Sequence, residues 1–278
     1  MIWRCGGRAF DVTRRALVMG VVNVTPDSFS DGGRYLDPAA ALGHARRLVD
    51  EGADLIDVGA ESTRPGAAPV VPELQIERLL PVIAPLAAER VCVSVDTASA
   101  EVARRAVEAG AEIINDVTGL GDPDMAGVIA AAGAGAVLMH MRGTPATMQQ
   151  DPRYDDVVAD VRVHLAARLA AARAAGIDAE RIAVDPGIGF GKTLEHNVAL
   201  LARLEELLPL GRPIVIGASR KSFLGRLTEA DLEGRLEGGL AAAAIAVLQG
   251  ARVIRTHDVG STVKALRVAE AIAAARPV

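Results

Sequence analysis

The amino-acid sequence predicts an α/β fold, a single-domain (β/α)8 barrel, and three observations predict it. Short β-branched runs alternate along the chain with Ala-, Leu- and Arg-rich stretches of helical period. There are eight such runs, which is the number of strands in this kind of barrel. Each run is followed by side chains that can bind or react, as expected where strand ends form one rim. The length of 278 residues suits one such domain, since these barrels commonly take about 250 residues.

The chain opens with a short segment that we expect to form a hairpin. Its turn would lie at Gly6-Gly7, so we assign residues 1–15 to the hairpin and 16–278 to the barrel, within one domain over 1–278. The centres of the runs are almost wholly apolar, as expected of parallel strands covered on both faces. The expected strands are Leu17–Val24, Leu55–Gly59, Val91–Asp96, Glu112–Val117, Ala136–His140, Arg181–Asp185, Pro213–Gly217 and Arg252–His257.

Helical stretches separate these runs, and several end at a glycine before the next strand. Such glycines, which are typical of helix C-termini, stand at positions 52, 110, 176 and 250. The expected helices include Pro38–Glu51, Glu73–Ala88, Ser99–Ala109, Asp155–Ala175, Leu194–Leu208, Arg235–Gln249 and Ser261–Ala275. The rival architecture is a doubly wound open sheet, which would carry a Gly-rich turn after its first strand and usually has fewer strands.

Composition argues against several classes of protein. Acidic residues number 35 and basic residues 30, for a net charge of −5, so we expect no nucleic acid as partner. The longest uncharged stretches fall short of the roughly 18 residues that span a membrane, so no membrane partner is expected. The N-terminus has no apolar core of a signal peptide, and Cys5 and Cys92 form no metal-binding pattern. A reducing, cytoplasmic setting is therefore expected.

The polar residues at the strand ends carry most of the functional information. In a barrel they would all lie at the carboxyl rim, where barrel enzymes bind and react. Capping of the next helix would explain one acidic residue after a strand, but it hardly explains polar groups at all eight ends. The groups are Asn23, Glu61 to Arg64, Asp96, Asn115 with Asp116, His140, Asp185, Ser219 to Lys221, and Arg255 with His257.

Two of these sets suggest particular ligands. Arg255 and His257 are two apart on a strand and share a face, which suits a phosphate or carboxylate; an ion pair with a neighbouring Asp is the alternative. Asp96, Asn115 and Asp185 together offer carboxylates and an amide to a planar heterocycle that bears amino, ring N–H and carbonyl groups. Capping of the next helix remains the alternative for each of these three.

Some of the remaining motifs suggest ligand binding, and two others only imitate nucleotide-binding motifs. Lys221 follows the seventh strand, where a helix N-terminus can help to hold an anion, although a solvated surface lysine is the alternative. The loops over 23–33 and 61–66 are polar and suit a lid or a substrate clamp. Gly191-Lys192-Thr193 imitates a phosphate-binding loop, but Pro186 stands where that motif needs glycine. The glycines of 187–191 are too closely spaced for a dinucleotide fingerprint.

With these residues in place, the chain resembles the dihydropteroate synthases, which sulfonamide drugs inhibit, over about its whole length. The first motif and Ser-Arg-Lys-Ser are specific to that family, and the others are supporting. Small departures are Ala60, where glycine is expected, and Thr256, where an apolar residue is common. The matching motifs are Gly20–Gly33, Glu61–Gly66, Val93–Thr97, Ile114–Val117, Leu138–Gly143, Asp185–Lys192, Gly217–Ser222 and Arg255–Val259.

The resemblance implies a (β/α)8 TIM-barrel transferase of folate biosynthesis. Such an enzyme condenses 6-hydroxymethyl-7,8-dihydropterin diphosphate with 4-aminobenzoate to give 7,8-dihydropteroate and diphosphate. The chemistry favours dissociative loss of diphosphate before attack by the weakly nucleophilic arylamine. The resemblance also implies Mg²⁺ as cofactor and a homodimer formed through helices away from the site.

The family's functional residues carry over onto matching positions of this sequence. Asp96, Asp185, Lys221 and Arg255 would form the catalytic set, and Asn23 would be the protein ligand of Mg²⁺. The pterin would be bound by Asp96, Asn115, Met139, Asp185, Phe190, Gly217, Lys221 and Arg255. The diphosphate would be met by Asn23, Thr63, Arg255 and His257. The aminobenzoate pocket would comprise Phe29, Arg64, Pro65, Lys221 and Ser222.

Two alternatives stay open at this point. A methyltetrahydrofolate–corrinoid methyltransferase shares a pterin-binding barrel, but it would not be expected to carry the 25–33 loop or Ser219–Ser222. A non-catalytic pterin-binding paralogue would keep the barrel and lose turnover. The intact set of Asn23, Thr63, Arg64, Lys221, Arg255 and His257 argues against that second alternative.

Overall fold

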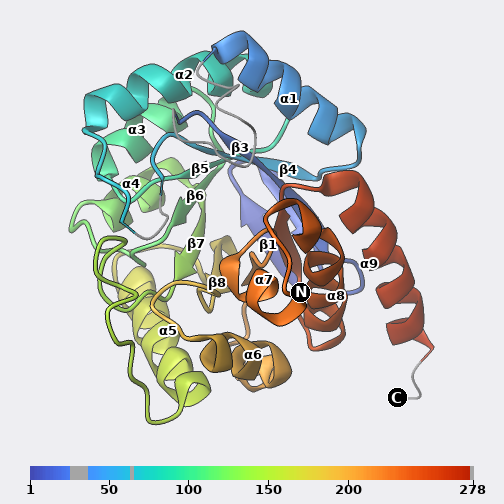
Figure 1. Cartoon of the computed structure of the whole chain (residues 1–278). Coiled ribbons are helices and arrows are strands. Elements are labelled where there is room, and N and C mark those ends of the chain that lie inside the picture. Colours follow the sequence, from blue (N-terminus) through green and yellow to red (C-terminus); the bar gives the residue numbers. More distant parts are fainter. Residues whose placement is uncertain (26–36, 63–65, 276–278) are drawn as a thin grey trace.

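The computed structural model describes residues 1–25, 37–62 and 66–275, and these form the predicted barrel (Figure 1). Eight parallel strands lie in the order β8-β7-β6-β5-β4-β3-β10-β9. The sheet closes between β8 and β9, where Val184 bridges Ile214 and its N–H donates to the carbonyl of Pro213 at 2.9 Å. The strands are β3 (Leu17–Asn23), β4 (Leu55–Gly59), β5 (Val93–Asp96), β6 (Ile113–Asp116), β7 (Gly135–Met139), β8 (Ile182–Asp185), β9 (Val215–Ile216) and β10 (Val253–Thr256).

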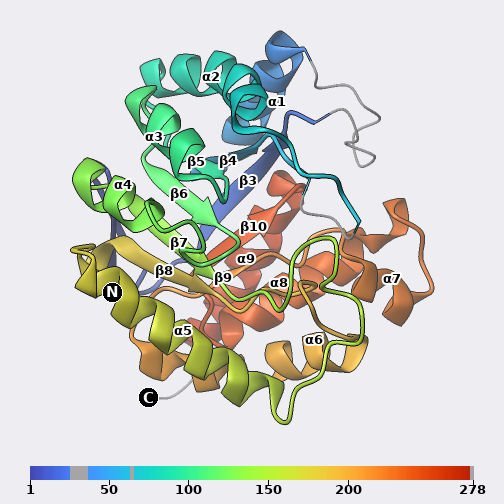
Figure 2. The same cartoon turned by 90° about the vertical axis from the view of Figure 1, so that its left-hand side faces the viewer.

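Helices surround the sheet on the outside (Figures 1 and 2). They are α1 (Pro38–Asp50), α2 (Pro72–Ala88), α3 (Ala100–Glu108), α4 (Met125–Ala132), α5 (Val157–Ala174), α6 (Leu194–Ala202), α7 (Ser222–Thr228), α8 (Leu236–Leu248) and α9 (Val259–Ala274), with short 3-10 turns η1 (Ala179–Arg181), η2 (Leu204–Leu210) and η3 (Glu233–Arg235). The predicted helix over 194–208 is wrong in its second half, because α6 ends at Ala202 and a 3-10 turn containing Pro209 follows. In the described ranges, none of the helices is both long and apolar enough to cross a bilayer.

The predicted N-terminal hairpin is confirmed. Strands β1 (Ile2–Cys5) and β2 (Arg8–Asp11) pair antiparallel around Gly6-Gly7. Trp3 is fully buried against the amino ends of the barrel strands, and its indole N–H donates to the carbonyl of Arg181 at 3.0 Å. The hairpin therefore closes one end of the barrel.

The alternation of side chains along each strand separates two apolar clusters. Residues such as Ile56 and Val58 face outward and pack under the helices. Their neighbours face the barrel axis, and at the hairpin end these inner residues are apolar: Leu17, Met19, Leu55, Ile113, Val137, Ala183, Val215 and Val253. The barrel thus has a dry floor beside the hairpin.

Two residues further along several strands, the inward-facing positions become polar. Asp57 follows Leu55 on β4, Asn115 follows Ile113 on β6, and Asp185 follows Ala183 on β8. Because strand residues two apart share a face, these polar side chains lie directly above the apolar floor. The site is therefore built inside the carboxyl half of the barrel.

Candidate active site

Arg255 lies at the centre of this polar layer and joins two carboxylates. Its Nε donates to Asp57 Oδ2 at 2.7 Å, and its Nη2 donates to Asp96 Oδ2 at 3.0 Å. Burial lowers the pKa of the guanidinium, but Asp57 and Asp96 outweigh burial and hold that pKa above its usual value. The alternative interpretation of Arg255 as a partner of acidic residues is thus correct, and these pairs place it inside the barrel rather than on its surface.

Asp57 is a site residue that the sequence analysis missed. Its carboxylate has no exposed surface and also accepts hydrogen bonds from Ser94 Oγ at 2.6 Å and Asn115 Nδ2 at 3.1 Å. Neither an ordinary strand-end position nor a motif marks it. The available signal was a charged residue in the middle of the apolar strand Leu55–Gly59, because an unpaired buried carboxylate is costly.

The carboxylates of Asp96 and Asp185 do not cap the helices that follow their strands. Ser99 caps α3 and Thr193 caps α6 through their side chains, so the capping alternative is wrong for both aspartates. Burial raises the pKa of Asp96 to about 7, with Arg255 acting against the rise and Asp57 adding to it. Burial also raises the pKa of Asp185, whose Oδ1 accepts from the N–H of Gly187 at 2.7 Å.

Lys221 adds an ammonium group to this polar layer. Its ammonium group donates to the carbonyl of Ile188 and lies 4.5 Å from the centre of the Phe190 ring. Burial lowers the pKa of Lys221 to about 8, while Asp185 acts to raise it. The alternative of a solvated surface lysine is therefore wrong. A Cβ on Gly217 would lie in ordinary contact, 3.6 Å from Arg255 Cβ, so the missing side chain leaves space beside Arg255.

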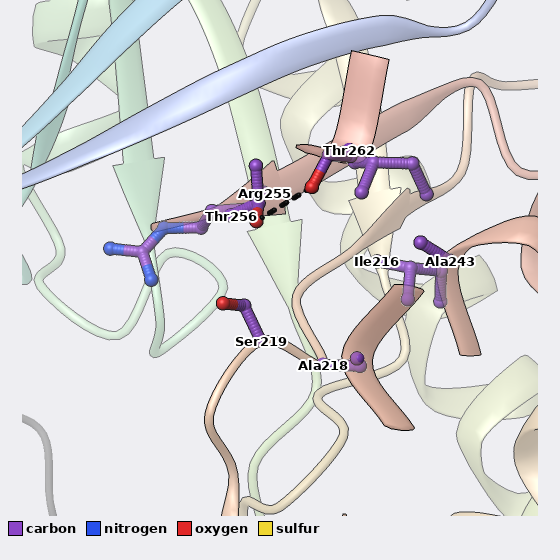
Figure 3. A pocket seen from close by; sticks show the side chains of 9 residues that line it. Ile216, Ala218, Ser219, Ala243, Arg255, Thr256 and Thr262 are labelled. Carbon is purple, nitrogen blue, oxygen red and sulfur yellow. Dashed lines mark hydrogen bonds between the residues drawn. The ribbon is translucent and has the colours of Figure 1, made fainter. Parts of the chain in front are cut away.

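His257 is held at the end of the strand that carries Arg255. Its Nδ1 lies 3.1 Å from Ser219 Oγ, which also accepts from the backbone N–H of His257 at 3.2 Å. Figure 3 shows Ser219 beside Arg255 and the hydrogen bond between Thr256 and Thr262. The two hydroxyl oxygens of that pair are 3.0 Å apart. That pair accounts for the departure at Thr256, because α9 supplies a hydroxyl partner there. A small pocket lies among Ile216, Ala218, Ser219, Gly239, Ala243, Ile254, Arg255, Thr256 and Thr262 (Figure 3).

Asn23 offers an oxygen at the rim of the barrel. A Cβ on Gly59 would lie 3.6 Å from Asn23 Oδ1 and 3.5 Å from Asp96 Cβ, so the glycine leaves room beside both side chains. Across the described ranges there is no cluster of three His, Cys, Asp or Glu side chains that could cage a metal. A single amide oxygen is enough for a Mg²⁺ ion whose other ligands come from substrate phosphates and water, so Asn23 fits such an ion.

Other polar groups at the strand ends are structural. Lys192 is 3% exposed and donates to His140 Nδ1 at 3.0 Å and to the carbonyl of Phe190 at 2.9 Å, so it is no phosphate lysine. Burial, together with the nearby Lys192, lowers the pKa of His140 to about 2. Asp116 caps the turn after β6 by accepting from the N–H groups of Thr118 and Leu120.

The structure brings together most of the predicted pterin set. Asp96, Asn115, Asp185, Lys221 and Arg255 meet inside the barrel, with buried Met139 on the inner face of β7 and Phe190 against Lys221. Ser222 is exposed at the first residue of α7. Phe29, Thr63, Arg64 and Pro65 lie outside the described residues.

Comparison with known proteins gives one consistent result. A family described as pterin binding enzyme matches residues 19–257. The chain is 48% identical over 260 residues to dihydropteroate synthase of Escherichia coli (strain K12), covering 93% of this chain and 92% of that one. A structure of Yersinia pestis dihydropteroate synthase with a sulfonamide drug complex aligns with a TM-score of 0.95 and 44% identity, covering 99% of this chain and 100% of that one. A structure of the Xanthomonas albilineans synthase in complex with 7,8-dihydropteroate aligns with a TM-score of 0.88 and 44% identity, covering 100% of both chains.

Proposed function

Because this chain belongs to the dihydropteroate synthase family of pterin-binding enzymes, we propose how its own residues divide the reaction among them. The enzyme is a transferase of folate biosynthesis and a sulfonamide target. It condenses 6-hydroxymethyl-7,8-dihydropterin diphosphate with 4-aminobenzoate to give 7,8-dihydropteroate and diphosphate. One observation supports the residue assignments that follow: acceptors, an ammonium group and a guanidinium converge above the apolar floor of the barrel.

The pterin ring binds on this polar layer. Asp96, Asn115 and Asp185 offer acceptors to the amino and ring N–H groups, and Lys221 donates to a ring carbonyl or nitrogen. Met139, Phe190 and Gly217 bound the slot that the flat ring occupies. The buried acceptors and the ammonium group together demand a ligand with both donors and acceptors along its edge.

The diphosphate lies at the mouth of the barrel. Arg255, His257, Thr63 and Asn23 bind its oxygens, and Asn23 would be the protein ligand of Mg²⁺. When bound, the ion neutralises negative charge on the diphosphate and so makes it a better leaving group. Arg255 is already desolvated and fixed in direction by two carboxylates, so little reorganisation is needed when charge develops on the phosphate oxygens.

The bond to diphosphate breaks before the new C–N bond forms. Departure of diphosphate leaves a cation conjugated with the pterin ring, and the carboxylates of Asp96 and Asp185 stabilise that charge. The incoming arylamine is neutral and loses its proton only after attack, so no strong general base is required. Phe29, Arg64, Pro65, Lys221 and Ser222 bind 4-aminobenzoate and shield the cation from water.

The enzyme acts as a homodimer in the cytoplasm. Ile245 on α8 and Val268 and Ile272 on α9 are 49%, 61% and 52% exposed, and α8 and α9 pack side by side. This apolar surface lies on the outside of the barrel, away from the mouth, and suits contact with a second copy. Cys5 and Cys92 are both free thiols, as expected in a reducing compartment.

A diphosphate-release assay tests the proposal. Release should require the pterin diphosphate, 4-aminobenzoate and Mg²⁺ together, and EDTA should abolish it. A non-catalytic pterin-binding protein would instead bind 6-hydroxymethylpterin in calorimetry and release no diphosphate under any of these conditions. Binding of the pterin without turnover would therefore contradict the assignment of catalytic roles.

A further inference from the structure

The carboxylate of Asp57 is fully buried and has three donors around it. Oδ1 accepts from Ser94 Oγ at 2.6 Å, whereas Oδ2 accepts from both Asn115 Nδ2, at 3.1 Å, and Arg255 Nε, at 2.7 Å. Asp57 lies on β4 beneath the rim, one step above the apolar floor. It is bound entirely by its neighbours and is not exposed to a ligand.

These bonds fix which way the amide of Asn115 points. A carboxylate oxygen that is paired with a guanidinium accepts and does not donate, so Asn115 must turn its NH2 group toward Asp57. The amide oxygen then points the other way. Asn115 Oδ1 has no hydrogen-bond partner among the described residues, yet it is not one of their buried unpaired atoms, so it keeps some accessible surface and is free to accept from a ligand.

The same carboxylate fixes the plane of the Arg255 guanidinium. Nε is held by Asp57 and Nη2 by Asp96, and two bonds to a planar group define its orientation. Arg255 and Asn115 come from β10 and β6, which are not neighbours in the sheet. Asp57 Oδ2 is the atom that both contact.

We propose that Asp57 is a positioning residue for pterin recognition. It presents the oxygen of Asn115, rather than its NH2, to a ring N–H, and it holds Arg255 ready for the face of the ring and for the diphosphate. The inference rests on the proposed function of the site, because it names the residue that sets the donor and acceptor pattern of that site.

The test compares two substitutions of Asp57 that differ in one property. Asp57→Asn can place its amide oxygen where Oδ2 lies and its NH2 group toward the hydroxyl of Ser94, so both anchoring contacts survive while the charge is lost. Asp57→Ala removes the contacts as well. We expect Asp57→Ala to weaken binding of 6-hydroxymethylpterin about 10- to 100-fold and Asp57→Asn to recover most of that loss. Ser94→Ala, which leaves both Oδ2 contacts in place, should change the affinity by less than about threefold.

A second measurement reports on the amide itself. The chain has three asparagines, Asn23, Asn115 and Asn197, so selective ¹⁵N-asparagine labelling gives three pairs of side-chain NH2 signals. The variant Asp57→Asn adds a fourth pair, from the substituted residue. The Asn115 pair, assigned in each protein with Asn115→Asp, should exchange slowly with solvent in the wild type and in Asp57→Asn, and rapidly in Asp57→Ala. This readout needs no turnover, so it distinguishes failure of the anchor from failure of the proposed function.

Two results for the Asp57 variants would overturn the proposal. Equal losses of pterin affinity in Asp57→Asn and Asp57→Ala would overturn the proposal, because charge alone would then explain the effect. Wild-type affinity and slow amide exchange in Asp57→Ala would overturn it as well. Should Asp57→Ala not fold, Asp57→Leu, which keeps the side-chain volume and removes the contacts, takes its place, and the same outcomes apply.

Discussion

The ammonium nitrogen of Lys221 lies 4.5 Å from the centre of the Phe190 ring and donates to the carbonyl of Ile188. This contact joins the loop after β9 to the loop after β8, directly above the strand end that carries Asp185. Lys192 fixes the far side of the same loop by donating to the carbonyl of Phe190 at 2.9 Å. One wall of the proposed pterin slot is therefore assembled by the protein alone, which lowers the ordering cost of binding.

Pterin binding should depend on pH on both sides of neutrality. Asp96 has a pKa of about 7, so it becomes protonated and loses acceptor capacity as the pH falls below that value. Lys221 has a pKa of about 8, so it loses its charge as the pH rises above it. Affinity for 6-hydroxymethylpterin, measured by calorimetry from pH 6 to 9, should be greatest between these values.

The variant Lys221→Arg serves as the control for that profile. A guanidinium does not titrate in this range, so the part of the alkaline decline that is due to Lys221 should disappear, whereas titration of the ligand itself would persist. An acid limb that remains unchanged in Asp96→Asn would contradict the role given to Asp96.

Asp185→Asn should weaken pterin binding and leave the fold intact. The asparagine oxygen can still accept from Gly187, but its NH2 group would face a ring donor, at a cost of about 1–3 kcal/mol. That corresponds to a loss of affinity of about 5- to 150-fold. Calorimetry measures the affinity, and circular dichroism checks the fold; wild-type affinity would show that Asp185 does not contact the ring.

Arg255→Lys should lose most activity although the charge is kept. Lysine cannot satisfy Asp57 and Asp96 with the same planar fork, nor cover a flat ring. We expect a loss of about 2–4 kcal/mol, or about 30- to 1,000-fold in kcat/KM for the pterin diphosphate. His257→Ala should have a smaller effect, because the neutral imidazole supplies one donor; near-normal turnover in Arg255→Lys would refute the placement of the diphosphate.

Trp3→Ala should destabilise the protein without altering kcat. The indole is fully buried and lies at the opposite end of the barrel from the site, so its removal should cost about 3–5 kcal/mol of unfolding free energy. Urea unfolding measures this cost, and a steady-state assay under folding conditions measures kcat. Phe10→Ala, which removes a half-buried ring 6.5 Å from Trp3, is the matched control and should cost less.

The strands could be located from the sequence because each hydrophobic run remains recognisable even when its first or last residues are assigned one or two positions away. β4 has the predicted bounds, whereas β5 begins at Val93 rather than Val91, since pairing with its neighbours sets where a strand begins. A helix N-terminus was expected near Lys221, but the extent of α7 was not predicted, because its seven residues carry too weak a period to define a helix.

Partners within the site are harder to predict, because they come from distant parts of the chain. Arg255 is 198 positions from Asp57 and 159 from Asp96, and local spacing says nothing about such pairs. The expectation that functional residues follow the strands at the carboxyl rim located Asp96, Asn115, Asp185 and Arg255, because all four lie at or next to strand ends. The same expectation missed Asp57, because this residue lies two positions before the end of β4 and contacts Asn115 and Arg255 rather than the rim.

The hairpin that seals the amino end of the barrel also has a kinetic consequence. Trp3 and the apolar floor fill that end, so we expect substrates to enter and leave at the carboxyl rim, where the polar residues lie. If the pterin ring binds at the depth of Asn115 and 4-aminobenzoate binds nearer the rim at Ser222, as proposed, bound 4-aminobenzoate would stand in the path of the pterin. We therefore expect ordered binding, with the pterin diphosphate first and 4-aminobenzoate second, and inhibition by excess 4-aminobenzoate that is not competitive for the pterin site.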